Sequence, residues 1–152
     1  WLPVAQRLCQ EDEAGRLTPC FLASVLRGQV QGFLTGAFGS PDDFAKDDYR
    51  RFSPRFQGEN FQRNLELVDQ VKSMAADKGV KPAQLALAWV LAQGEDLIPI
   101  PGTKHRTYLE ENIAAVDIEL SQADLARLNA LFPPDAAAGM RYPEAVMTMV
   151  NI

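Results

Sequence analysis

The chain contains 152 residues, of which 47% are hydrophobic and 23% are charged, and its formal net charge is -5. This composition predicts a globular domain, and the acidic balance argues against broad binding to nucleic acids or to anionic membranes. The sequence contains neither an apolar run of about 20 residues nor a signal-peptide pattern, so we expect no membrane span, no secretion and a reduced, cytoplasmic setting. Cys9 and Cys20 are too few for a disulfide framework, and with a single histidine they form no metal-binding pattern.

Residues 32–61 form a long segment that has no sustained helical or strand period. The segment is rich in glycine and aromatic residues. This pattern predicts a loop, which would be either a lid over a ligand or an ordinary surface loop. Residues 1–31, which precede it, carry no motif that indicates a function.

Two helices are predicted after this loop. Residues 59–78 carry an apolar stripe at helical spacing, and Gly79 follows as a typical C-terminal stop. Pro82 then opens a second helix at its first turn. That helix, residues 83–92, is apolar on most sides and is therefore expected to be buried, with Trp89 in the core.

Residues 97–100 read as a buried strand that ends at a proline–glycine turn before a cationic helix start. Gly102 would let backbone amides approach a ligand closely. Thr103, Lys104 and Arg106 surround the free N–H groups of the next helix, where an anion is stabilised. Two cations at this place favour a dianionic phosphate monoester. Arg106 is the favoured main contact because its planar fork can bind two phosphate oxygens, with Lys104 as a mobile point charge.

The predicted elements then end with one more helix. Ser121 and Asp124 form the ends of a capping-box-like start, and Leu125, Leu128 and Leu131 share one face of the helix that follows. The succession of helix and strand with short connections is typical of an α/β barrel, although a doubly wound sheet would give a similar local pattern.

These segments resemble the C-terminal half of the aldo-keto reductases, (β/α)8-barrel enzymes that use NADPH. In that family the turn after the last strand holds the 2′-phosphate of the cofactor, and a Glu-Asn pair on the next helix faces the adenine. Glu111 and Asn112 stand at that place in this chain. Gly32-Phe-Leu-Thr-Gly36, with residues 40–44 and 52–61, is similar to the pyrophosphate-covering loop of the branch that contains auxin-induced and perakine-reductase-like proteins.

The resemblance implies an α/β fold, a partial (β/α)8 TIM barrel with about strands 7–8 and the surrounding helices. It covers residues 32–152 and leaves residues 1–31 as a divergent N-terminal segment. It implies NADP(H) as the cofactor and the following cofactor-binding residues: Gly32, Leu34, Gly102, Thr103, Lys104, Arg106, Glu111 and Asn112.

The catalytic Tyr, Lys, Asp and His of the family lie in its N-terminal half, so we expect this chain to be a fragment that lacks all four. His105 lies at the adenosine end and is interpreted as a solvated imidazole or a minor phosphate contact. Tyr49, Tyr108 and Tyr142 do not match the context of the family's acid. Lowering the pKa of a tyrosine toward neutrality requires a nearby lysine and a carboxylate behind it.

Three functions remain open at this point. In the first, the chain is the NADP(H)-binding half of an enzyme that reduces small carbonyl compounds in its intact form. Alternatively, it is a non-catalytic nucleotide-binding regulatory module. In the third reading it is a structural half-barrel, whose open strand edges and uncovered apolar interior would favour a homodimer.

Overall fold

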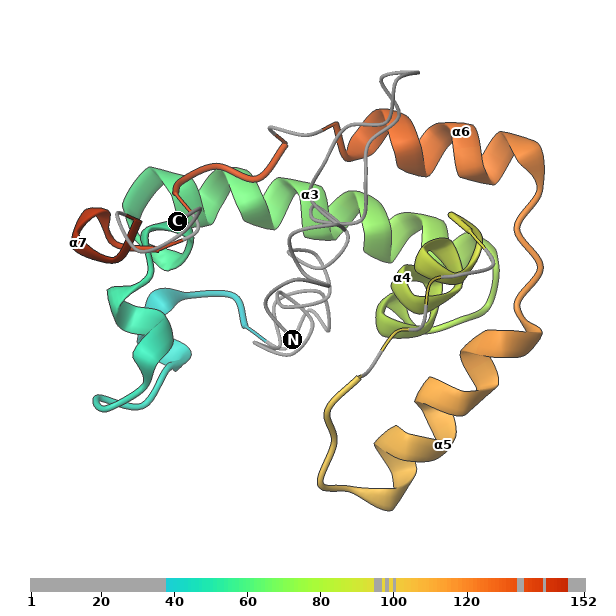
Figure 1. Ribbon diagram of the computed structural model, residues 1–152, viewed down its shortest axis with the longest axis horizontal. Helices are drawn as coiled ribbons and strands as arrows, with labels where there is room; N and C mark the ends of the chain where they lie inside the picture. The colour runs from blue at the N-terminus through green and yellow to red at the C-terminus, as the bar shows by residue number, and fades with distance from the viewer. Residues whose placement is uncertain are drawn as a thin grey trace.

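The computed structural model describes residues 38–94, 97, 99, 101–133, 136–140 and 142–147, and all regular structure in these residues is helical (Figure 1). The α-helices are α3 (Gly58–Asp77), α4 (Pro82–Leu91), α5 (Arg106–Ala114), α6 (Gln122–Leu131) and the short α7 (Glu144–Met147). The 3-10 helices are η2 (Pro41–Asp43), η3 (Tyr49–Phe52), η4 (Pro54–Phe56) and η5 (Ala115–Asp117). The long α3 runs beside α6, and α5 lies at the opposite end of the molecule from the segment that carries η2 to η4 (Figure 1).

The two helices predicted after the loop are confirmed. Helix α3 ends as expected, because Gly79 adopts a φ of 67° and donates its N–H to the carbonyl of Ala76 at 3.0 Å. Val80 donates to the carbonyl of Ala75 at 3.0 Å, which completes a Schellman motif. Pro82 occupies the first turn of α4, where its missing N–H removes no helical hydrogen bond.

The main hydrophobic core lies between α3, α4 and α6. Trp89 of α4 is buried and belongs to this core, as predicted. Its indole Nε1–H donates to Asn129 Oδ1 of α6 at 2.8 Å, and its ring lies 5.3 Å from the ring of Phe132. The indole therefore joins α4 to α6 through both an apolar and a polar contact.

The strand predicted at residues 97–100 is not confirmed. Leu97 and Pro99, the two described positions of that range, belong to no strand, and residues 98 and 100 lie outside the described part. A single extended segment gains no ladder of hydrogen bonds without a neighbouring strand, and the described residues provide none. The helices of the prediction are therefore present, whereas the partial barrel is not confirmed.

An aromatic cluster fixes the segment from residue 38 to residue 57. The spacing of the aromatic residues in the sequence did not predict this cluster. Phe44, Phe56 and Phe61 are buried together, with Phe38 packed against them. The guanidinium carbon of Arg50 lies 4.4 Å and 4.5 Å from the ring centroids of Phe38 and Phe44. Such cation–π contacts hold the segment as a packed surface element.

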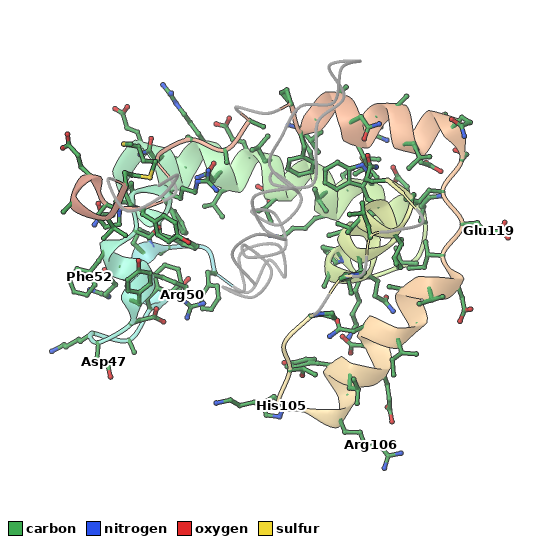
Figure 2. The ribbon with its side chains drawn as sticks, viewed as in Figure 1. Asp47, Arg50, Phe52, His105, Arg106 and Glu119 are labelled. Carbon is green, nitrogen blue, oxygen red and sulfur yellow. The ribbon has the colours of Figure 1, made fainter. Side chains whose placement is uncertain are left out.

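Arg50 is itself held by a carboxylate. Its Nε donates to both carboxylate oxygens of Asp48 at 2.9 Å and 3.0 Å, and this side-chain hydrogen bond lowers the pKa of Asp48. The labelled Phe52 and Asp47 stand outside the packed rings and point to the surface (Figure 2).

The chain near residue 138 is bound to α3 by one buried amide. The side chain of Asn64, only 5% exposed, accepts from the N–H of Ala138 at 2.8 Å and donates to its carbonyl at 3.0 Å. The same amide donates to the carbonyl of Arg55 at 2.9 Å, and Arg55 Nε donates to the carbonyl of Gly139 at 3.2 Å. Asn64 thus ties the C-terminal segment and η4 to α3.

The capping box predicted at Ser121 and Asp124 is confirmed at the start of α6, and it makes the fold sensitive to acid. Asp124 Oδ2 lies 2.8 Å from Lys78 Nζ and accepts from the N–H of Ser121 at 2.9 Å. Lys78 and Ser121 lower the pKa of Asp124 from 3.8 to about 2. Because the folded pKa lies below the unfolded one, the carboxylate stabilises the fold above pH 3.8, and this contribution is lost as the pH falls to about 2.

We therefore expect the wild type to melt at a higher temperature than Asp124→Asn at pH 6. The difference should shrink as the pH falls below 3.8 and vanish only below about 2, where the carboxyl group is protonated in the folded state as well. Thermal unfolding followed by circular dichroism at a series of pH values measures it. A difference that stays constant across this range would contradict the role of the ionised carboxylate.

Candidate functional site

The turn at residues 101–105 leads into an α5 whose N-terminus has no side-chain cap. His105 occupies the N-cap position in an extended conformation, and its side chain makes no capping hydrogen bond. The hydroxyl of Thr103 accepts from the N–H of His105 at 3.2 Å and donates to its carbonyl at 3.1 Å, which fixes the turn locally. The first amides of a helix without such a cap remain donors for water or for an anionic ligand.

The two predicted cations flank this helix start. Arg106 is 90% exposed, and its Nε donates to Glu110 Oε1 at 2.8 Å. Lys104 is exposed as well. An exposed pair of this i,i+4 type contributes only about 0.3–0.5 kcal/mol, so a phosphate can replace Glu110 at little cost. His105 and Arg106 lie at the free end of α5 (Figure 2).

Gly102 is not required by the packing of the protein itself. A Cβ built at this position meets no heavy atom within 4 Å, and the backbone has no positive φ. The absence of a side chain is therefore explained neither by strain nor by a close neighbour. It leaves open space over the backbone beside Thr103, which suits a bound group that approaches the main chain.

Glu111 and Asn112, the predicted adenine-facing pair, lie one turn farther along α5. Both are half-buried. The carboxylate of Glu111 pairs with Lys81 Nζ, and Gln84 Nε2 donates to the Glu111 carbonyl at 3.0 Å. Lys81 and Gln84 belong to the start of α4 and were not predicted to take part. The sequence contained one indication for Gln84. It stands at the third position of α4, where a glutamine often completes a capping box.

The structure groups some of the predicted site residues and leaves others apart. Gly102 to Arg106 form one exposed turn, whereas Gly32 and Leu34 lie outside the described residues. Arg50 and Phe52, from the loop expected to cover the cofactor, lie to the left of His105 and Arg106 and apart from them (Figure 2). The described part of the site is consequently an open surface at the start of α5.

Other possibilities in the described part of the chain are a metal site, a membrane-spanning helix and a second pocket. The described residues contain no group of three or more His, Cys, Asp or Glu that could hold a metal ion, and none of their helices is long and apolar enough to cross a membrane. His105 is exposed, and its ring centroid lies 5.3 Å from that of Tyr108 in a T-shaped arrangement. An open groove of about 530 Å³ lies between α3 and α6, lined by Leu67, Gln70, Met74, Arg127, Ala130, Leu131, Pro133 and Ala136.

Comparisons with known proteins place most of the chain in one family. Residues 23–132 match the model of the Aldo/keto reductase family. The chain is 50% identical over 113 residues to aldo-keto reductase yakc of Schizosaccharomyces pombe, a protein named for NADP(+), with 74% of this chain and 33% of the relative covered. It is 42% identical over 111 residues to aldo-keto reductase str7 of Strobilurus tenacellus, with 73% and 33% covered. The matched part of the chain spans about a third of the length of these curated relatives.

Proposed function

Because the chain belongs to the aldo/keto reductase family, we propose that residues 101–112 bind the adenosine end of NADP(H). The observation that carries this proposal is the uncapped N-terminus of α5, flanked by Lys104 and Arg106 and preceded by the Thr103 hydroxyl. This donor set suits a phosphate monoester, because it combines helix amides with two full positive charges. The name of the Schizosaccharomyces pombe relative, which specifies NADP(+), supports the choice of cofactor.

The 2′-phosphate would occupy the open space beside Gly102. Arg106 would exchange Glu110 for two phosphate oxygens, and Lys104 would approach as a second positive charge. The Thr103 hydroxyl, whose one proton goes to the His105 carbonyl, would rotate to donate to the phosphate instead and would still accept from the N–H of His105.

The adenine would lie against Glu111 and Asn112. A carboxylate only accepts hydrogen bonds, and the 6-amino group is the donor that adenine offers, so Glu111 would bind that group. The amide of Asn112 both donates and accepts, so it suits the ring nitrogen and the 6-amino group together.

Further parts of the proposal concern the complete fold. Residues 32–152 would form the C-terminal part of a (β/α)8 barrel, with residues 1–31 as a divergent segment. Gly32 and Leu34 would contact the cofactor pyrophosphate, as in the branch with auxin-induced and perakine-reductase-like proteins. We also propose that the protein is located in the cytoplasm.

The intact form of such a protein would reduce small aldehydes or ketones. When bound, NADPH supplies the hydride for that reaction. The family's catalytic Tyr, Lys, Asp and His have no counterparts that we can match in this chain, so we propose that it binds the cofactor without turnover. A steady loss of 340 nm absorbance with a panel of aldehydes would sink this part of the proposal.

The second candidate is a half-barrel that associates with another copy. Exposed apolar side chains along α5 favour it: Leu109 and Ile113 lie one turn apart, and Val116 follows in η5. The spacing i, i+4 and i+7 places the three side chains on one face, and contiguous exposed apolar patches mark interaction sites. Sedimentation velocity over a range of concentrations decides the question, since a monomer at every concentration would exclude this candidate.

The phosphate contact is tested by cofactor preference. NADPH should bind at least about tenfold tighter than NADH, equivalent to about 1.4 kcal/mol, and Arg106→Ala should remove most of this difference. Fluorescence titration measures both dissociation constants. Arg127→Ala is the matched control, because Arg127 is also an exposed arginine near a carboxylate, 3.7 Å from Asp77. Equal affinity of the wild type for both cofactors would contradict a 2′-phosphate site at this turn.

A further inference from the structure

Three polar side chains join the start of α4 to the middle of α5 in a closed circuit. The N–H of Lys81 donates to Gln84 Oε1 at 3.0 Å, and Gln84 Nε2 donates to the Glu111 carbonyl at 3.0 Å. The circuit closes where Lys81 Nζ binds Glu111 Oε1. Both the backbone and the carboxylate of Glu111 are thereby fixed from α4.

The ion pair in this circuit is a poor candidate for a stabilising device. The Lys81 side chain is 59% exposed, and surface pairs of this kind contribute little to stability because water screens them and long side chains lose entropy. The carboxylate of Glu111, in contrast, is only 21% exposed. The clearest effect of the pair is therefore geometric, because it sets the direction of one carboxylate.

The position of the Glu111 carboxylate bears on ligand binding because Glu111 lies close to the proposed phosphate site along α5. Glu111 lies on the same short helix as Arg106, whose start we propose as the phosphate site. The pair with Lys81 engages Oε1, and among the described contacts Oε2 has no partner. An acceptor oxygen thus remains for a ligand that reaches along α5.

We propose that Lys81 is a positioning residue for adenine recognition, because it holds the Glu111 carboxylate in the orientation that accepts from the 6-amino group. This inference rests on the proposed function, since it requires NADP(H) to bind along α5. Lys81 does not touch the cofactor in this account. It acts through Glu111, with Gln84 fixing the backbone at the same residue.

The test compares NADPH with its hypoxanthine analogue, in which a carbonyl oxygen replaces the 6-amino group. The wild type should bind NADPH about tenfold tighter than the analogue, because a carboxylate facing a carbonyl oxygen loses its hydrogen bond. In Lys81→Met this ratio should fall close to one, while the preference for NADPH over NADH is retained. A purely structural loss would weaken both cofactors and the analogue equally.

Matched variants separate the positioning role from other effects. Lys72→Met removes a lysine of another surface pair, 3.2 Å from Asp69, and should leave the ratio unchanged. Lys81→Arg should retain most of the ratio because it can still donate to Glu111. In a Glu111→Gln background, Lys81→Met should have no further effect on the ratio. Lys81→Gln provides the same test if the methionine variant does not fold.

The outcomes distinguish this inference from the function on which it rests. An unchanged ratio in Lys81→Met, or an equal loss of affinity for NADPH and the analogue, would overturn the role of Lys81 and leave NADP(H) binding intact. A wild type that binds NADPH without discriminating the analogue would also overturn it. A wild type that binds neither NADPH nor NADH would instead remove the proposed function itself.

Discussion

Replacing Trp89 with alanine will lower the free energy of unfolding by about 3–5 kcal/mol, the usual cost of deleting a buried aromatic side chain. Trp89 is 3% exposed, packs against Phe132 and donates to Asn129. The substitution removes the ring that joins α4 to α6 and leaves a cavity between them. Since α4 also carries Gln84 and has Lys81 as its N-cap residue, we expect cofactor binding to weaken as well. Urea unfolding followed by circular dichroism measures the loss.

Two variants separate the apolar and polar parts of this effect. Trp89→Phe keeps a ring near Phe132 and loses the indole donor, and Asn129→Ala removes only the acceptor. Each should cost about 1–2 kcal/mol, well below the alanine variant. A Trp89→Ala protein that unfolds at the same urea concentration as the wild type would show that the α4–α6 contact does not hold the core.

The second large effect is expected at Asn64. Leucine has a similar volume but cannot bond the N–H and the carbonyl of Ala138 or the carbonyl of Arg55, all of which the amide satisfies. Leaving such buried groups without partners costs about 1–3 kcal/mol each, so Asn64→Leu should destabilise the protein by at least about 2 kcal/mol. Hydrogen exchange should show faster exchange first in residues 136–140, because their attachment to α3 is lost.

Gln62→Leu is the control for this variant. Gln62 lies on the same helix as Asn64 but is exposed, so the same kind of substitution should change the stability by less than about 0.5 kcal/mol. If Asn64→Leu were as stable as this control, the amide would not be what holds the C-terminal segment.

The helices could be predicted because their signals are local. Gly79 and Pro82 mark the end of one helix and the start of the next, and both act within a single turn of backbone. Ser121 and Asp124 likewise form their capping box within four residues. The strand at residues 97–100 depended instead on neighbours that no local pattern provides, and it is not confirmed.

Contacts between distant residues could not be predicted from spacing alone. The burial of Phe44 against Phe61 and the attachment of Ala138 to Asn64 both join segments with no common period. Helix α7 was not predicted either, because four residues are too few for a periodic pattern.

The candidate site was predictable in part. The turn at Gly102 to Arg106 precedes α5 where the sequence indicated, and its charges lie at the helix start. The partners of the side chains were not predicted. Arg106 pairs with Glu110, four residues along the same helix, whereas Glu111 pairs with Lys81, which precedes a different helix. The roles of Gly32 and Leu34 stay predictions, since both lie outside the described residues.

The central claim is that the start of α5 binds the adenosine 2′-phosphate. The most direct measurement is a titration of the isotope-labelled chain with adenosine 2′,5′-bisphosphate, followed through the backbone amide signals by NMR. We expect saturable shifts at Gly102 to Arg106 and at Glu111, with much smaller shifts for adenosine 5′-monophosphate, which lacks the 2′-phosphate. Equal responses to the two nucleotides, or shifts confined to other parts of the chain, would contradict the account.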